Sequence, residues 1–324
     1  MSIGVVLNPR SRRNLRDPDA ALRLARALGD HGIVREVKSI DDLHRTAEDF
    51  KRLEIDVLGI SGGDGTNHVT ITGFLSVYSP TPIPQLAFLR GGTMNTVANA
   101  VGIARGKPEG VLGRVIRGYA ERAVRPLANV ERHVMRIGPV GAAANDSRVN
   151  YGFLFGTGVV YGYLAEYYRN GEPSPLIAAK TLARGVGSTL VGGETIRRMA
   201  KPFRGSVSLD DGKTWETRDY LSVAGGTIDQ IGLNFRPFYR YGERESAFHL
   251  LGIYASPFQF VRELPRIARA RPMGPNRTLE AVTSRAIISS ADGTTRYMID
   301  GDLHEVVGDL EVAVGPRVKI VVAP

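Results

Sequence analysis

A short apolar run that ends in a glycine-rich turn places the strongest constraint on how this chain can fold. Val57–Ser61 is apolar or small, and Gly62–Thr66, which reads Gly-Gly-Asp-Gly-Thr, follows it directly. The apolar run predicts a buried parallel strand, and Thr66 is a suitable cap for a helix that continues through Ile71. The glycines would allow positive φ angles and close approach of the backbone to a ligand. Strand, turn and helix N-terminus together point backbone N–H groups at a phosphate, so we predict a phosphate-binding loop here.

Two common phosphate-binding motifs do not fit this loop, and one motif of another class does. The Walker sequence G-x-x-x-x-G-K-[ST] does not occur in the chain, and the turn is not the G-x-G-x-x-G of a dinucleotide-binding domain. The residues 59–63 fit G-x-S-x-G, which would make Ser61 the nucleophile of an α/β-hydrolase-type serine esterase. Asp300 and His304 follow in the required order, but they are too close in sequence to occupy separate loops. The esterase stays an alternative, as does a tight turn that binds no ligand.

Strand-like and helical segments alternate over residues 1–125, which predicts a parallel α/β domain. The predicted strands are Ile3–Leu7, Val34–Val37, Ile55–Ile60 and Gln85–Phe88. A second glycine-rich loop, Gly91–Asn95, follows the last of these strands. Two such loops at the carboxyl ends of neighbouring strands indicate a nucleotide site.

The pattern changes over residues 126–324. Short strand-like segments, several of them separated by turn signals such as Asp292-Gly293, predict a mostly antiparallel β domain with some helix inserted. Within this part, Phe258–Arg271 mixes apolar residues with arginines. It could form a helix at a membrane interface or a helix that packs on the core with a solvated face, and Pro265 would limit its length.

Composition restricts the compartment and the partners. With 324 residues, of which 43% are hydrophobic, the chain can bury two cores or one large one. Cysteine is absent, which excludes disulfides and thiolate chemistry and fits a reducing compartment. We expect no transmembrane helix, and Met1–Pro9 is too short and too soon charged for a signal peptide. A cytoplasmic protein is therefore expected, peripheral at the inner face of the membrane.

Four segments resemble the diacylglycerol kinase-like lipid kinases, which are related to sphingosine, ceramide and NAD kinases. The turn 62–66 is similar to their GGDGT signature, and the residues 8–11 to their opening N-P-x-S-G. The residues 92–95, followed by Gly102-Ile103, are similar to a G-T-x-N-D…L-G-I segment, and Asp300–Asp302 to a late D-G-E. The sequence departs from the pattern at Arg12, Thr96 and Asp302, which replace a glycine, an acid and a glutamate.

The resemblance implies an ATP-dependent lipid kinase with an N-terminal nucleotide-binding domain, 1–125, and a C-terminal β-sandwich lipid-substrate domain, 126–324. Such an enzyme transfers the γ-phosphoryl group of ATP, with Mg²⁺, to a primary hydroxyl of diacylglycerol, ceramide or a related lipid. NAD kinase is the nearest rival, and a nucleotide-binding protein with weakened catalysis is a third reading. The residues implied in nucleotide binding are Asn8, Pro9, Ser11, Gly62, Gly63, Asp64, Gly65, Thr66, Gly92, Thr93 and Asn95.

Three carboxylates are the expected catalytic groups. By resemblance, Asp300 accepts the proton of the lipid hydroxyl, and Asp302 contributes to the metal site. We expect Asp300 to project from a turn toward the substrate. Asp64 can orient Mg²⁺, and it is the alternative base.

The net charge of +9 points to an anionic partner. An anionic membrane surface and a phosphorylated substrate both fit, and a well-solvated arginine-rich surface would also account for the charge. We expect no nucleic-acid partner, because no helix-turn-helix, zinc finger or RNA-binding signature is present. The sequence leaves the oligomeric state open, a homodimer included.

Overall fold

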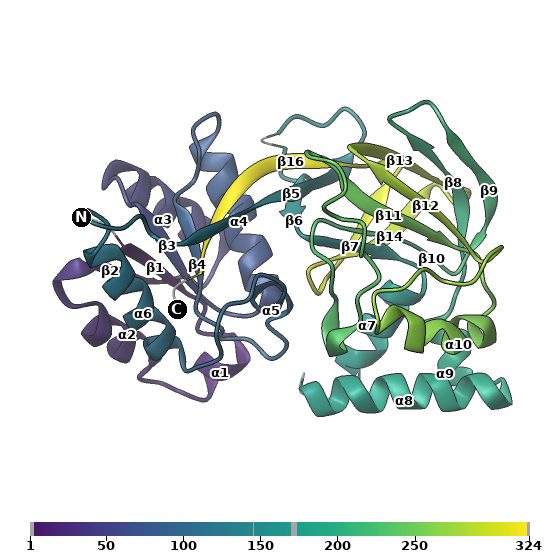
Figure 1. Cartoon of the computed structure of the whole chain (residues 1–324), viewed down its shortest axis with the longest axis horizontal. Helices are drawn as coiled ribbons and strands as arrows, with labels where there is room; N and C mark the ends of the chain where they lie inside the picture. Colours follow the sequence, from purple (N-terminus) through teal and green to yellow (C-terminus); the bar gives the residue numbers. More distant parts are fainter. Residues whose placement is uncertain (1–2, 145, 170–173, 323–324) are drawn as a thin grey trace. The chain divides into compact units, whose positions relative to one another are not determined.

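The computed structural model describes residues 3–144, 146–169 and 174–322. The chain forms two compact units, the first within Met1–Arg132 and Arg317–Pro324 and the second within His133–Pro316. We describe the units separately (Figure 1).

The first unit is built on a parallel sheet in the order β2-β1-β3-β4-β16. Its strands are β1 (Ile3–Leu7), β2 (Gly32–Glu36), β3 (Val57–Ser61), β4 (Gln85–Phe88) and the C-terminal part of β16 (Leu310–Val321). Strands β1 and β3 are buried along their whole length, as a parallel sheet covered on both faces requires.

Helices cover both faces of this sheet. They are α1 (Arg12–Leu15), α2 (Ala20–Leu28), η1 (Gly29–His31), α3 (Ile40–Arg52), α4 (Asp64–Tyr78), α5 (Thr96–Ala100) and α6 (Pro108–Ala120). Figure 1 shows α3 and α4 on one side of the sheet and α2 and α6 on the other. In α3, the Ser39 hydroxyl accepts the N–H of Asp42 at 3.1 Å and caps the helix, while Leu43, Ala47 and Phe50 are buried on one face.

The start of α4 differs from our expectation. The helix begins at Asp64, and the cap position is Gly63, whose φ and ψ of −93° and −173° are extended. Thr66 already lies inside the first turn, so the prediction that it caps the helix is wrong. The reason is that the backbone turns immediately after Gly63 and leaves no further linking residue.

The second unit is a β-sandwich of two mostly antiparallel sheets. One contains β8 (Phe203–Leu209), β9 (Thr214–Tyr220), β13 (Arg285–Ser290), the N-terminal part of β16, and β5 (Asn129–Pro139) with β6 (Asn150–Gly152). The other has the order β12-β11-β10-β7-β14-β15. Its strands are β7 (Leu154–Thr157), β10 (Ser222–Gly226), β11 (Phe248–Ile253), β12 (Thr278–Thr283), β14 (Thr294–Ile299) and β15 (Asp302–Val307). Side chains from both sheets form one core, among them Phe155, Tyr220, Phe248, Ile288 and Tyr297.

Helices are inserted into the sandwich, as the sequence predicts. They are α7 (Val159–Arg169), α8 (Pro175–Val191), α9 (Glu194–Met199), η2 (Gly232–Asn234) and α10 (Pro257–Ile267). A capping box between Ser256 and Gln259 starts α10, and Pro265 lies within the helix near its end. Across the described residues, no helix combines the length and the apolar character that a membrane span requires.

The C-terminus departs from the predicted division of the chain. The sequence placed all of 126–324 in the second domain, whereas residues 317–324 return to the first unit. The return is made by β16, which pairs with β13 at Leu310 and runs parallel to β4 at Ile320.

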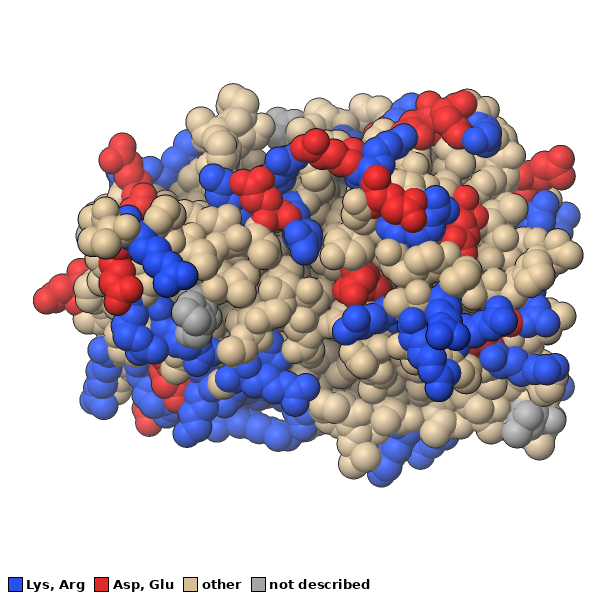
Figure 2. Space-filling view, in the orientation of Figure 1, with Lys and Arg blue, Asp and Glu red and all other residues tan. Residues whose placement is uncertain are grey.

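In the view of Figure 2, Lys and Arg side chains gather where Figure 1 places α10.

Candidate phosphate-binding loops and carboxylates

The turn from β3 to α4 needs glycine because other atoms approach it closely. A Cβ atom on Gly62 would overlap the side chain of Thr66. Neither Gly62 nor Gly63 adopts a positive φ, so the expected need for left-handed glycines in this turn is not met. The requirement is one of space: the backbone has to pass where no side chain fits.

The second glycine-rich loop lies against the first one, backbone to backbone. A Cβ atom on Gly63 would lie 3.2 Å from the Cα atom of Gly92, and one on Gly91 would lie 2.8 Å from the amide nitrogen of Gly62. Strands β3 and β4, which lead into the two loops, are parallel neighbours. The structure therefore brings Gly62, Gly63 and Gly92 together at the carboxyl edge of the sheet, beside the N-terminus of α4.

Asp64 joins the two loops. Its Oδ2 atom accepts the N–H of Thr96 at 2.9 Å, and its Oδ1 atom accepts the N–H of Val97 at 3.2 Å. Burial raises the pKa of Asp64, while these hydrogen bonds and the charge of Arg90 act in the opposite direction. The carboxylate thus caps the start of α5 and fixes the position of the second loop.

The loop after β1 is tied to the same edge of the sheet. The Asn8 side chain donates to the Thr66 hydroxyl at 3.0 Å, and the Asn8 amide donates to the Ser61 carbonyl at 3.1 Å. Asn14 donates to the carbonyls of Asn8 and Ser61 at 2.9 and 3.0 Å. Ser11 lies between Pro9 and α1; it is buried, and its hydroxyl has no hydrogen-bond partner among the described residues. A buried polar atom without a partner is costly, so this hydroxyl is available to bond a ligand atom.

Asn95 gives the second loop its shape. Its φ and ψ are both 48°, a left-handed conformation that asparagine tolerates. Its side chain accepts the N–H of Gly92 at 3.2 Å and donates to the Gly92 carbonyl at 2.9 Å. The loop is thereby closed on itself, with the half-buried Thr93 inside it.

Two residues that support the loops were not foreseen from the sequence. Arg90 is buried with a φ of 58°, and it donates to the Ile103 carbonyl at 3.0 Å and to the Asn99 side chain at 2.6 Å. An arginine directly after the apolar strand and before two glycines was the available signal. Asn14 offered no such signal, because its partner Ser61 is 47 residues away in the sequence.

Asp300 is an internal anchor of the second unit. It lies in the turn between β14 and β15 with a φ of 44°, and only 3% of the residue is exposed. Both of its carboxylate oxygens accept the N–H of Phe153, at 3.1 and 3.0 Å, and Oδ1 also accepts the N–H of Leu154 at 2.8 Å. The expectation that Asp300 projects from its turn is wrong, because the left-handed turn aims the side chain at the backbone that begins β7.

Asp302 is the less buried acid of this turn and the first residue of β15. Burial raises the pKa of Asp302, and the nearby His304 opposes the rise. The described residues contain no group of three or more His, Cys, Asp or Glu side chains placed to hold a metal ion. A Mg²⁺ ion held with a nucleotide needs only one or two protein carboxylates, so single acids are sufficient donors.

Ser61 does not fit the esterase alternative. It is the last residue of β3 and fully buried, and its hydroxyl contacts the Asn14 side chain at 3.4 Å. A hydrolase nucleophile has to be exposed on a strained turn after the strand. The fit to G-x-S-x-G therefore has no counterpart in the geometry.

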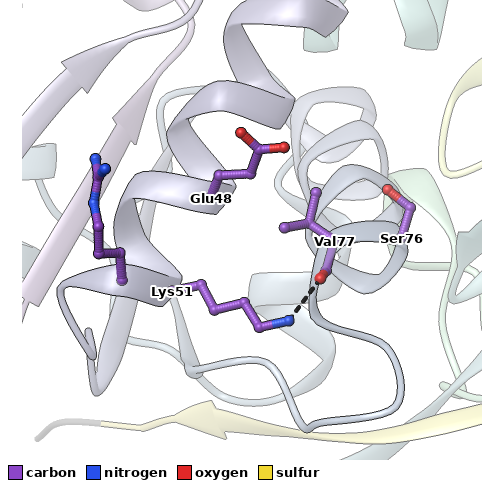
Figure 3. Close-up of a pocket in the computed structure, with 5 residues that line it drawn as sticks. Glu48, Lys51, Ser76 and Val77 are labelled. Carbon is purple, nitrogen blue, oxygen red and sulfur yellow. Dashed lines mark hydrogen bonds between the residues drawn. The ribbon is translucent and has the colours of Figure 1, made fainter.

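A shallow surface pocket lies at the other end of α4, away from the glycine loops. Glu48 and Lys51 of α3 and Ser76 and Val77 of α4 line it, and Lys51 Nζ donates to the Val77 carbonyl at 2.9 Å (Figure 3). The pocket lies near the C-terminal ends of both helices, where the helix dipoles favour cations over phosphate. It is not the site to which the glycine loops point.

Comparisons with known proteins agree with the resemblance drawn from the motifs. Residues 2–124 match the family model of the diacylglycerol kinase catalytic domain, and no curated protein matches the chain. A candidate diacylglycerol kinase from Bacillus anthracis str. Sterne superposes with a TM-score of 0.68 at 14% identity, covering 100% of this chain and 97% of that chain. A diacylglycerol kinase structure from the same organism gives a TM-score of 0.61 at 13% identity, with the same coverage.

Yeast NADH kinase complexed with NADH has a TM-score of 0.51 at 12% identity, covering 100% of this chain and 84% of that chain. At these identities the solved structures establish the fold. The family match over residues 2–124 confirms the resemblance to diacylglycerol kinases in that part of the chain and supports a kinase.

Proposed function

We propose, from the diacylglycerol kinase catalytic domain that residues 2–124 match, that the protein is an ATP-dependent lipid kinase. It would transfer the γ-phosphoryl group of ATP to a primary hydroxyl of diacylglycerol, ceramide or a similar lipid. The observation that carries the proposal is the backbone contact between two glycine-rich loops, which Asp64 joins at the carboxyl edge of a parallel sheet.

The residues of this edge suit the phosphates of a nucleotide. Gly62, Gly63 and Gly92 leave a backbone surface without side chains, and the N-terminus of α4 favours negative charge there. The buried hydroxyl of Ser11 is a donor without a partner among the described residues. When bound, ATP supplies the phosphoryl group and Mg²⁺ neutralises its charge.

Asp64 and Asn95 hold the loops in place for this ligand. The Asp64 carboxylate is committed to the N–H groups of Thr96 and Val97, and Asn95 is committed to Gly92. These bonds fix the loops before a ligand arrives, which reduces the cost of ordering them on binding. Asp64 then acts mainly as a positioning residue.

The acceptor of the hydroxyl proton is proposed to be Asp302. By resemblance the role belonged to Asp300, but that carboxylate is buried and accepts the backbone N–H groups of Phe153 and Leu154. Asp302 is less buried, and its raised pKa makes it a stronger base than an ordinary aspartate. Asp300 would hold the turn that presents Asp302. The resemblance instead gives Asp302 a place in the metal site, where a bound Mg²⁺ would lower its pKa, so the two roles are alternatives with different experimental signatures.

A phosphoryl-transfer assay tests the proposal. Purified protein is incubated with γ-labelled ATP, Mg²⁺ and, separately, diacylglycerol, ceramide, a sphingoid base and NAD in detergent micelles. We expect label in a lipid. Label in NAD alone would assign the chain to the rival function, and label in no acceptor would contradict a kinase of either kind. Ser61→Ala should change turnover little, whereas an esterase would lose its nucleophile.

Asparagine variants of the three acids separate their roles. General-base help is worth about 10²–10⁴-fold in rate, so Asp302→Asn should lower kcat by that order and flatten the acid limb of the pH–kcat profile. A metal ligand would instead raise the Mg²⁺ concentration needed for half-maximal rate. Asp300→Asn should lower the free energy of unfolding by roughly 1.5–3 kcal/mol, since it disturbs bonds to a buried charged acceptor.

Asp292→Asn is the matched control for the variants of Asp300 and Asp302, because Asp292 is exposed in the neighbouring turn between β13 and β14.

Asp64→Asn should mainly weaken ATP binding. If Asp64→Asn binds ATP normally but abolishes turnover, while Asp302→Asn retains wild-type kcat, the base is Asp64.

A further inference from the structure

Helix α8 of the second unit turns an apolar face outward. Leu176 is 62% exposed and Val191 is 81% exposed, at opposite ends of the helix. Ala179, Ala183 and Gly187 are also exposed, at helical spacing between them. The opposite face, with Ala178 and Thr181, is buried. Surface helices normally present charged and polar residues to water, so this outward face needs an explanation.

The only charges on α8 are positive. Lys180 and Arg184 are both exposed, and the sequence contains no Asp or Glu between Ser174 and Gly193. The outward face therefore combines small and apolar side chains with cations.

Helix α10 contacts α8, and it too exposes an apolar side chain together with basic ones. Phe258, in its first turn, is 48% exposed. Four arginines on α10 and just after it are exposed, namely Arg262, Arg266, Arg269 and Arg271, and Figure 2 shows basic side chains gathered where Figure 1 places this helix.

The single acid of α10 does not cancel this charge at the surface. Glu263 is 4% exposed and turned inward, where it accepts the N–H of Gly274 at 3.1 Å and pairs with Arg277. Arg266 approaches it only to 3.8 Å. We call Leu176, Lys180, Arg184, Val191, Phe258, Arg262, Arg269 and Arg271 the α8–α10 surface.

We propose that the α8–α10 surface binds the face of an anionic lipid bilayer. Exposed Leu, Val and Phe side chains can enter the headgroup region, while Lys and Arg are attracted by anionic lipids. The inner leaflet of the plasma membrane carries such lipids. This proposal deepens the proposed function. The purpose of membrane binding rests on that function, because the lipid that a lipid kinase phosphorylates resides in a bilayer.

The charge of the surface disfavours a second copy of this chain as the occupant. A symmetric contact would bring the same patch from both copies together, and like charges placed face to face cost several kcal/mol. An anionic bilayer is complementary to both the charge and the apolar side chains of the surface.

Vesicle sedimentation without ATP tests the proposal independently of catalysis. The protein of 324 residues is mixed with neutral phosphatidylcholine vesicles or with vesicles that contain phosphatidylglycerol, at low and high salt. We expect binding to the anionic vesicles that weakens as salt rises. The double variant Lys180→Gln/Arg262→Gln should bind roughly 25-fold more weakly, which is about fivefold for each charge removed.

The chain offers a closely matched control for the apolar part. Val191→Ser should weaken binding severalfold, whereas Val307→Ser should not, because Val307 is equally exposed at 80% but lies on β15. Equal effects of the two valine variants would overturn the proposal. Equal binding to neutral and anionic vesicles, or binding to neither, would also overturn it.

Two further measurements distinguish other outcomes. A concentration-dependent dimer of the wild type that Val191→Ser abolishes would assign the surface to a second copy and overturn the proposal. Lipid phosphorylation in detergent micelles reports on catalysis separately. If the vesicle results are as expected while no lipid is phosphorylated, the membrane-binding proposal holds and the kinase proposal fails. If a lipid is phosphorylated in micelles while the vesicle results are not as expected, the kinase proposal holds and the membrane-binding proposal fails.

Discussion

At the scale of single residues, several polar groups of the candidate site are occupied by the protein itself. Asp64, Asn95 and Asp300 have short bonds to backbone groups of other segments or of their own loop. Their types and positions could be read from the sequence, but these bonds could not. Asp64 and Thr96 are 32 residues apart, and Asp300 and Phe153 are 147 apart. Only the folded chain shows that these acids hold loops and turns.

A glycine substitution tests the contact between the two loops. In Gly92→Ala the added methyl group would overlap the backbone of Gly63, and only movement of a loop could relieve the overlap. We expect the free energy of unfolding to fall by roughly 1–3 kcal/mol and ATP affinity to fall at least tenfold. Thermal unfolding and titration calorimetry measure the two effects.

Gly110→Ala is the matched control for this substitution. Gly110 lies in α6, where an added Cβ atom meets nothing within 4 Å, so helix propensity should stabilise the protein by about 0.5–1 kcal/mol. Normal ATP affinity in Gly92→Ala would show that the loop contact does not shape the nucleotide site.

At the scale of elements, strands made of a continuous apolar run were predictable from the sequence. Helix α8, which lacks the usual pattern of an amphipathic helix, was not. The predicted strands Ile3–Leu7 and Gln85–Phe88 are present with those bounds, because a buried parallel strand requires a continuous apolar run. Helix α8 was not predicted as an individual element. It contains Gly185 and Gly187 and has a face of small residues on its outside, so its apolar positions do not show the usual period of an amphipathic helix.

The carboxylate of Asp210 links several elements of the second unit, and the pH dependence of stability can test this link. Asp210 follows β8 and accepts hydrogen bonds from Ser284 at 2.8 and 2.6 Å, from Thr283 at 2.7 Å and from Arg244 at 2.8 Å. Burial alone would raise the pKa of Asp210, but these bonds outweigh it and hold the pKa well below the ordinary value of 3.8. Folding therefore favours the charged form, and this contribution to stability is complete above about pH 4 and is lost as pH falls below that.

We expect Asp210→Asn to lower the free energy of unfolding by about 2 kcal/mol at neutral pH, and we expect its difference from the wild type to shrink below about pH 4. Urea unfolding at a series of pH values measures this. Asp211→Asn is the control, since Asp211 is exposed in the same turn and pairs with Lys213. A difference that stayed constant down to about pH 2 would show that the charge of Asp210 is not the stabilising feature.

At the scale of the whole molecule, the chain leaves the first unit and returns to it at its end. Composition and pattern predicted an α/β part followed by a β part, and that order is present. The return of the last strand was not predictable, because Val318–Val321 is as apolar as a strand of the sandwich would be. The choice of β4 as its neighbour depends on a free sheet edge that exists only after folding.

The return predicts that a C-terminal substitution damages the N-terminal unit. Ile320 is fully buried and pairs with Leu86 of β4, so Ile320→Ala should lower the free energy of unfolding by about 2–5 kcal/mol. Hydrogen exchange followed by mass spectrometry should show the loss of protection in β3, β4 and α4, with the second unit little changed. Lys319→Ala, at an exposed neighbouring position, should leave both units unchanged. If Ile320→Ala instead exposed the sandwich strands while β3 and β4 stayed protected, the C-terminal strand would belong to the second unit in solution.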